Sequence, residues 1–182
     1  MFMVADASTP YPDEGVLHRR IEGDFRFNDL ILSPDDVIDA YRAARAGRGD
    51  STEPRELWSA IVSDRSFRVV SIRAAEAQAT HAPTYMYLFT WESPAMRGAL
   101  GACHALEIPF VFGTLDVTTM DRFAGSGPDA ERLSGQMSDA WIAFARTGNP
   151  NHAGIPDWPT YDLGRRATMD FGPDTQVLDA PY

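Results

Sequence analysis

The spacing of apolar residues predicts a first well-defined helix that begins at Pro34. Ser33 is a good N-cap, and proline is favoured in the first helical position. Apolar side chains then recur on one face, and Gly47 is expected to end the helix. The members of that face are Val37, Ile38, Tyr41 and Ala44. The same periodicity predicts helices over about 53–63 and about 65–80.

The third of these helices is expected to begin at Asp64 as its cap and to end before Pro83. Its apolar residues available for packing are Phe67, Val70, Ile72 and Ala75. A fourth helix, of about 18 residues, is expected from Gly127-Pro128 onward, because apolar residues recur there at spacings of three and four. This stripe consists of Ala130, Leu133, Met137, Trp141, Phe144 and Ala145.

The strongest strand pattern lies at residues 84–91, TYMYLFTW. Aromatic and β-branched residues dominate it, and both of its faces are apolar, as in a strand that is covered on both sides. We therefore expect a central strand of an α/β sheet. Two short strand patterns at 167–171 and 175–179 flank Gly172-Pro173, and they predict a terminal β-hairpin.

This order of elements indicates part of a larger α/β domain, since a self-contained α/β sheet alternates strand and helix several times. We interpret residues 1–182 as one partial domain, with residues 1–30 as an atypical lead-in. Helices surround one or two central strands in this interpretation. A strand of this apolar kind that lacks a partner on one side exposes unpaired backbone groups, which favour pairing with another chain. We therefore expect the isolated chain to form a dimer through the unpaired strand, to aggregate or to repack.

Composition and charge exclude several classes of function. The 182-residue chain is 44% hydrophobic with a net charge of −10, which disfavours nucleic acids and anionic membranes as partners. The single cysteine, Cys103, excludes an internal disulfide, and the four histidines are dispersed, so we expect no metal and no cofactor. No apolar run reaches the roughly 18 residues of a membrane span, and no signal peptide is recognisable, so a cytoplasmic location is expected.

His104 is the most promising residue for chemistry. It follows the predicted strand in a run of small residues, with Glu107 three positions on. A histidine in such a loop is a candidate general base. The alternative is a buried structural histidine bonded to the backbone, and spacing alone leaves both open. A Cys103–His104 dyad is disfavoured, because adjacent side chains rarely point at one another productively.

Several segments resemble the type B carboxylesterases, a family that includes para-nitrobenzyl esterases and cholinesterases. GACHALEIPFVFGTLD (101–116) resembles the family's catalytic-histidine segment. MSDAWIAFARTGNPN and then PDWPTYD resemble its C-terminal helix and Pro-Trp-Pro-x-Tyr segment. SDRSFRVVSIRAAEAQ and PTYMYLFTW resemble the helix and strand before the histidine. The resemblance implies the C-terminal part of an α/β-hydrolase fold and a serine carboxylesterase that acts on small-molecule esters.

The resemblance also assigns roles to individual residues. It places His104 as the general base of a Ser-His-Glu triad. Asp13-Glu14-Gly15 resembles the end of the family's acid motif, so Glu14 is the candidate triad acid, although the motif's glycine and asparagine are absent here. The alternative for Glu14 is a solvated residue in a turn. Glu107 matches a family glutamate that lies beside the triad rather than in it.

The serine nucleophile is not recognisable in this sequence. Neither Ser126 nor Ser134 lies in a Gly-x-Ser-x-Gly elbow, and no HGGG-like oxyanion segment occurs. In α/β-hydrolases the serine precedes the acid and the histidine, so the resemblance implies that an N-terminal half carries the nucleophile. We expect the chain to contribute His104 to such an enzyme and to be inactive alone. The alternative is a truncated remnant without catalysis, or a fragment that binds a partner.

Overall fold

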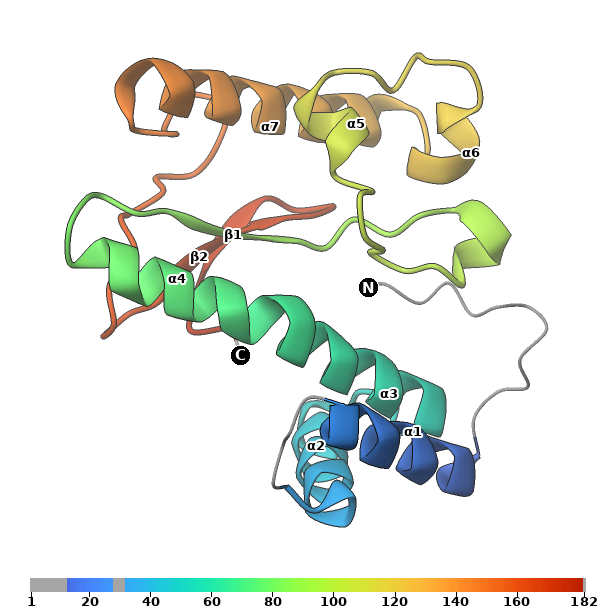
Figure 1. The fold of residues 1–182 in the computed structure, drawn as a ribbon. Helices are drawn as coiled ribbons and strands as arrows, with labels where there is room; N and C mark the ends of the chain where they lie inside the picture. The colour runs from blue at the N-terminus through green and yellow to red at the C-terminus, as the bar shows by residue number, and fades with distance from the viewer. Residues whose placement is uncertain (1–12, 28–31, 182) are drawn as a thin grey trace. The chain divides into compact units, whose positions relative to one another are not determined.

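The structure is a computed structural model that describes residues 13–27 and 32–181 (Figure 1). The chain divides into two compact units, which meet between Val70 and Ser71. Each unit has a hydrophobic core of its own.

In its described residues the first unit contains the helices α1 (Glu14–Phe27), α2 (Pro34–Arg48) and α3 (Pro54–Ser63). Their buried side chains form one core, which consists of Leu17, Ile21 and Phe25 of α1, Ile38 of α2, and Leu57 and Ile61 of α3. The helix α1 was not expected from the sequence. Its three core residues recur every four positions and therefore share one helical face.

The N-terminal end of α2 lies where the sequence predicted it, whereas the predicted C-terminal end is wrong. Ser33 is the N-cap, and its hydroxyl accepts a hydrogen bond from the Asp36 amide (3.4 Å). The helix does not stop at Gly47 but continues to Arg48. Gly49 ends it in the left-handed conformation (φ 78°), with its amide donating to the carbonyl of Ala46. That conformation favours glycine, because a Cβ would clash with the backbone.

Asp64 does not cap a new helix, so the break expected between the helices at about 53–63 and about 65–80 is wrong. Its backbone is helical (φ −64°, ψ −48°), and the chain passes from α3 through one π-helical turn, Asp64–Arg68, into α4 (Val69–Ala79). The expected packing residues Phe67 and Val70 are exposed instead, at 42% and 57%. Only Ala75 of the four is fully buried in the structure.

The second unit is built on a three-stranded sheet in the order β1 (Met86–Phe89), β2 (Ala167–Phe171) and β3 (Gln176–Asp179). β1 runs parallel to β2, with Phe89 opposite Phe171, and β2 and β3 form the predicted antiparallel hairpin. The middle strand is β2, and all of its residues are buried. Within the described residues β1 lies at the edge of this sheet and is half-buried, so one of its sides lacks a strand partner, as expected for part of a larger sheet.

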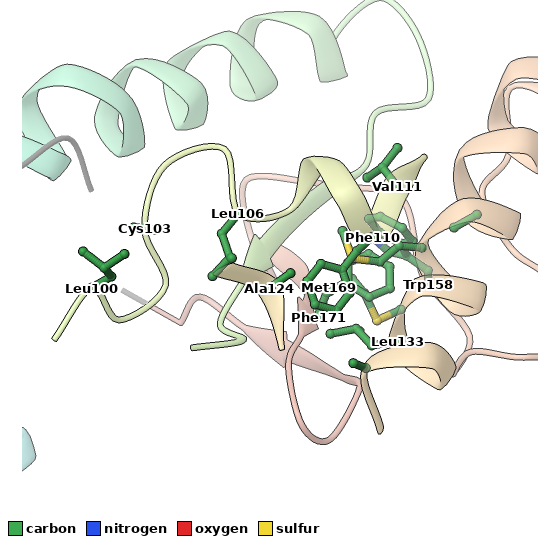
Figure 2. Close-up of a cluster of buried hydrophobic side chains, with 13 residues drawn as sticks. Leu100, Cys103, Leu106, Phe110, Val111, Ala124, Leu133, Trp158, Met169 and Phe171 are labelled. Carbon is green, nitrogen blue, oxygen red and sulfur yellow. The ribbon is translucent and has the colours of Figure 1, made fainter. Parts of the chain in front are cut away.

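Helices cover both faces of the sheet in the second unit. Figure 1 shows α7 (Pro128–Thr147) and α5 (Ile108–Val111) on one side and α4 on the other. The core between the sheet and α7 includes Phe110, Leu133, Met137, Met169 and Phe171, several of which are drawn in Figure 2. These five side chains have no exposed surface.

The predicted stripe of α7 is buried only in its first half. Ala130, Leu133 and Met137 are fully buried, whereas Trp141 and Phe144 are about half exposed, at 48% and 49%. The ring of Trp141 still contacts the ring of Tyr87 edge-on, with 6.5 Å between the ring centroids. Phe144 contacts Tyr85 in the same way, with 6.1 Å between the centroids. Gly148 caps the helix with φ 75°, so α7 spans 20 residues, close to the expected length of about 18.

Candidate active site

His104 lies on a turn that follows β1 in the second unit. Its own side chain is exposed, whereas Leu100 and Cys103 before it and Leu106 after it are buried (Figure 2). Buried neighbours on both sides fix the turn to the core and leave the imidazole facing outward. This exposure contradicts the alternative of a buried structural histidine, and it leaves the imidazole accessible for proton transfer.

The backbone after His104 adopts an uncommon conformation. Ala105 has φ 66°, in the left-handed region, and Gly101 has φ 55°. A non-glycine residue in that region costs roughly 1–2 kcal/mol, so the surrounding structure must hold it. The amide of Cys103 donates to the Gly101 carbonyl (2.9 Å), and the amide of Leu106 donates to the Cys103 carbonyl (3.3 Å). A hydrogen-bonded turn of this kind fixes where the His104 side chain leaves the backbone.

The two residues near His104 that the sequence singled out have different surroundings. Burial raises the pKa of the Cys103 thiol, and the negative charge of Glu107 acts in the same direction. A thiol that keeps its proton is a poor nucleophile, which argues against a Cys103–His104 dyad. Glu107 is half-buried and is the N-cap of α5, and its carbonyl accepts hydrogen bonds from the amides of Phe110 and Val111.

Glu14 is the first residue of α1, in the first unit, and its carboxylate is exposed. Both carboxylate oxygens accept hydrogen bonds from the Arg42 guanidinium, at 2.9 and 3.0 Å. In this structure Glu14 therefore joins α1 to α2 by an ion pair. Its assignment as the triad acid stays a prediction.

The two serines weighed as nucleophiles occupy different surroundings. Ser134 is buried in α7, and its hydroxyl donates to the Phe110 carbonyl (2.9 Å), which is a structural role. Ser126 is exposed just before α7. Among residues 13–27 and 32–181 there is no cluster of three side chains that could hold a metal ion. In the same ranges no helix is long and apolar enough to cross a bilayer.

The sequence did not reveal two buried polar residues of the second unit. Ser93 is 1% exposed and lies between β1 and the His104 turn. Asp170, at the end of β2, is 9% exposed, and its carboxylate accepts a hydrogen bond from Thr90 (2.6 Å). Serine is common in loops and aspartate in turns, so neither residue type carries a signal unless its burial is known.

Comparisons with known proteins agree with the arrangement of these elements. A family model described as the carboxylesterase family matches residues 26–181 of this chain, which include the β1 strand, the His104 turn and the terminal hairpin. The chain belongs to the carboxylesterase family. Glu14 precedes the matched residues, whereas His104 and Glu107 lie within them.

Individual curated proteins resemble the chain over most of its length. Phenmedipham hydrolase of Pseudarthrobacter oxydans is 39% identical over 135 residues, which cover 73% of this chain and 27% of that protein. Para-nitrobenzyl esterase of Bacillus subtilis is 36% identical, with 70% and 26% covered. The chain thus spans about a quarter of the length of these curated relatives.

Solved structures give the fold. A carboxylesterase of Geobacillus stearothermophilus superimposes with a TM-score of 0.67 at 36% identity, over 80% of this chain and 30% of that one. A thermophilic PNB esterase superimposes with a TM-score of 0.69 at 28% identity, over 99% and 34%. These neighbours are carboxylesterases with the α/β-hydrolase fold, so the predicted fold class of this family member is confirmed.

Proposed function

We propose that this chain supplies the catalytic histidine, His104, of a serine carboxylesterase. The observation that carries the proposal is an exposed imidazole on a strained turn, held by buried neighbours, in a member of the carboxylesterase family. Strained backbone clusters at active sites, and an imidazole, whose ordinary pKa is near neutrality, suits general acid–base catalysis. The class of substrate is a small-molecule carboxylic ester.

The proposed chemistry is acyl transfer. The His104 imidazole would accept the proton of a serine hydroxyl while the serine oxygen attacks the ester carbonyl. The same proton would then pass to the leaving alcohol, and a water molecule would repeat the sequence to release the acid. A carboxylate that accepts a hydrogen bond from the other ring nitrogen would hold His104 in the tautomer needed for catalysis and stabilise the imidazolium. We propose Glu14 for that role, on its resemblance to the family's acid motif.

The serine and the oxyanion hole are proposed to come from polypeptide outside these 182 residues. The sequence contains no Gly-x-Ser-x-Gly elbow, and the curated relatives are about four times as long as the matched part. Within the described residues β1 pairs with β2 on one side only. A free strand edge of this kind favours pairing with a further strand.

The test reconstitutes the enzyme from two polypeptides. The 182-residue chain is assayed with a small aryl ester, alone and mixed with Bacillus subtilis para-nitrobenzyl esterase that lacks the matching segment. A serine-reactive phosphonate is included in parallel assays. We expect no phosphonate-sensitive turnover by either polypeptide alone, and phosphonate-sensitive turnover by the mixture.

Size-exclusion chromatography of the same mixture makes each outcome informative. Complex formation without turnover would contradict the catalytic proposal and favour a non-catalytic fragment that binds a partner. Phosphonate-sensitive turnover by the chain alone would place the nucleophile within these 182 residues, against the proposal. Absence of both complex and turnover would contradict the proposed assembly.

A further inference from the structure

Ser93 connects the turn that carries His104 to the short helix α6 (Met120–Ala124). The side chain is 1% exposed, and three hydrogen bonds meet at this residue. The Ser93 amide donates to the Gly101 carbonyl (3.1 Å), and the Ser93 hydroxyl donates to the Phe123 carbonyl. The same hydroxyl oxygen accepts a hydrogen bond from the Ala95 amide (3.2 Å).

The Gly101 carbonyl belongs to the turn itself. It accepts one hydrogen bond from Ser93 and a second from the amide of Cys103, the residue before His104. Two hydrogen bonds therefore lead from the Phe123 carbonyl through Ser93 to Gly101, and a third continues to Cys103. Trp91 adds a parallel connection, because its indole Nε1 donates to the Ala124 carbonyl (2.8 Å).

Serine suits this position for a physical reason. Its hydroxyl donates and accepts at once, so it satisfies both the Phe123 carbonyl and the Ala95 amide in a volume that excludes water. Removing the hydroxyl would leave both backbone groups without a partner in a buried position. Buried groups without partners are costly, so the local backbone would shift to find new ones.

We propose that Ser93 is a positioning residue for His104, acting by holding the Gly101 end of its turn against α6. Ser93 does not contact the reacting atoms in this account. It fixes the backbone from which the imidazole projects, and small displacements of a general base slow proton transfer. The kinetic part of this inference rests on the proposed function, whereas the structural part does not.

The test compares Ser93→Ala with Ser134→Ala in the full chain by NMR. Ser134 is the matched control, since it is also a buried serine whose hydroxyl donates to a backbone carbonyl, that of Phe110. Hydrogen exchange of the Cys103 amide is measured, together with the His104 ring resonances, which a His104→Gln variant identifies. Exchange reports local opening of the turn without any need for activity.

We expect Ser93→Ala to speed exchange of the Cys103 amide by about tenfold or more and to move the His104 ring resonances. Ser134→Ala should change both by less than about twofold at a similar loss of global stability. Ser93→Thr, which keeps the hydroxyl, should restore the slower exchange. Where Ser93→Ala does not fold, Ser93→Cys gives the same comparison, because a thiol is a weak donor.

Equal effects of the two serine variants, or unchanged exchange in Ser93→Ala, would overturn the proposal. In the reconstituted enzyme, Ser93→Ala should lower kcat by about tenfold and leave KM unchanged. A looser turn with an unchanged kcat would also overturn the positioning role. If the mixture with the parent chain shows no turnover, the proposed function fails, and the exchange data alone decide whether Ser93 holds the turn.

Discussion

The hydroxyl of Thr90 donates to Oδ1 of Asp170 over 2.6 Å, and this bond joins the ends of the parallel strands β1 and β2. The Thr90 amide also donates to the Phe171 carbonyl (2.8 Å). Gly172 packs so closely against this pair that a Cβ there would overlap the Thr90 hydroxyl. The chain leaves β1 at this point and enters the segment that carries His104, so this junction supports the candidate site.

The first prediction concerns Gly172. Gly172→Ala should lower the free energy of unfolding by about 1–3 kcal/mol, because its new methyl group overlaps Thr90. In a Thr90→Ala background the same substitution should cost less by at least about 1 kcal/mol, since the overlapping oxygen is gone. Urea denaturation of the four proteins measures this coupling. Additive effects of the two substitutions would contradict the contact.

Two glycines near the end of α2 provide a matched pair. Gly49→Ala should destabilise the chain by about 1–2 kcal/mol, because its left-handed conformation (φ 78°) is strained for a residue with a Cβ. Gly47→Ala should stabilise it by about 0.5–1 kcal/mol, because Gly47 lies inside the helix with open space around it. Chemical denaturation of both variants checks the sign. If Gly47→Ala is the more harmful change, the helix ends where the sequence pattern placed it.

The alkaline stability of the first unit should depend on Tyr41. Burial raises the pKa of the Tyr41 phenol above its ordinary value of 10.0, and the nearby Asp64 carboxylate, which accepts its hydrogen bond (2.9 Å), acts in the same direction. Above about pH 10 the unfolded chain therefore loses this proton first, and stability falls as the pH rises. Tyr41→Phe removes the titrating group and should show a shallower loss between pH 9 and 11.

Urea unfolding of the parent and of Tyr41→Phe across this pH range measures the two slopes. Tyr87 and Tyr161 also have a raised pKa because of burial, so the parent slope is expected to be shared among the three groups. Tyr41→Phe should cost about 1 kcal/mol at pH 7 through the lost hydrogen bond. If the unfolding free energies of the two proteins change equally with pH, Tyr41 has the same pKa in the folded and the unfolded chain, against this prediction.

Self-association through β1 is the next prediction. Within the described residues, one side of β1 has no strand partner. Two half-exposed aromatic rings lie beside this strand. Trp141 contacts Tyr87 of β1, and Phe144 contacts Tyr85, the residue just before β1. We expect sedimentation velocity to show dimers or larger species that increase with concentration. A Leu88→Lys substitution in β1 should reduce them, since charge opposes edge pairing. A compact monomer at all concentrations would count against this account.

The sequence predicted those features that local chemistry determines. Ser33 and Gly127 lie at the helix starts where they were expected, and the hairpin around Gly172 is confirmed. Capping and turn residues act through their nearest neighbours, so a single sequence reveals them. The helix α1 was missed because Gly23 and Asp24 are unfavourable inside helices, although three apolar residues spaced by four outweigh them.

Other features depend on contacts between distant segments. Phe67 was expected to pack and is exposed, whereas Asp170 is a charged residue type that is nevertheless buried against Thr90. Burial of Asp170 needs a partner 80 positions away, which no local pattern shows. For the same reason the sequence identified His104 as a candidate but could not identify Ser93, whose partners Gly101 and Phe123 come together only in the fold.

Turnover of a His104→Gln variant in the reconstituted enzyme decides whether His104 is the general base. His152→Gln is the matched control, because its ring nitrogens contact the Gln136 carbonyl (3.0 Å) and the Gly154 amide (3.1 Å) in a structural role. We predict that His104→Gln lowers kcat for an aryl ester by roughly a thousandfold or more, while His152→Gln lowers it by less than about tenfold. A loss under tenfold in His104→Gln would contradict the assignment of His104 as the general base.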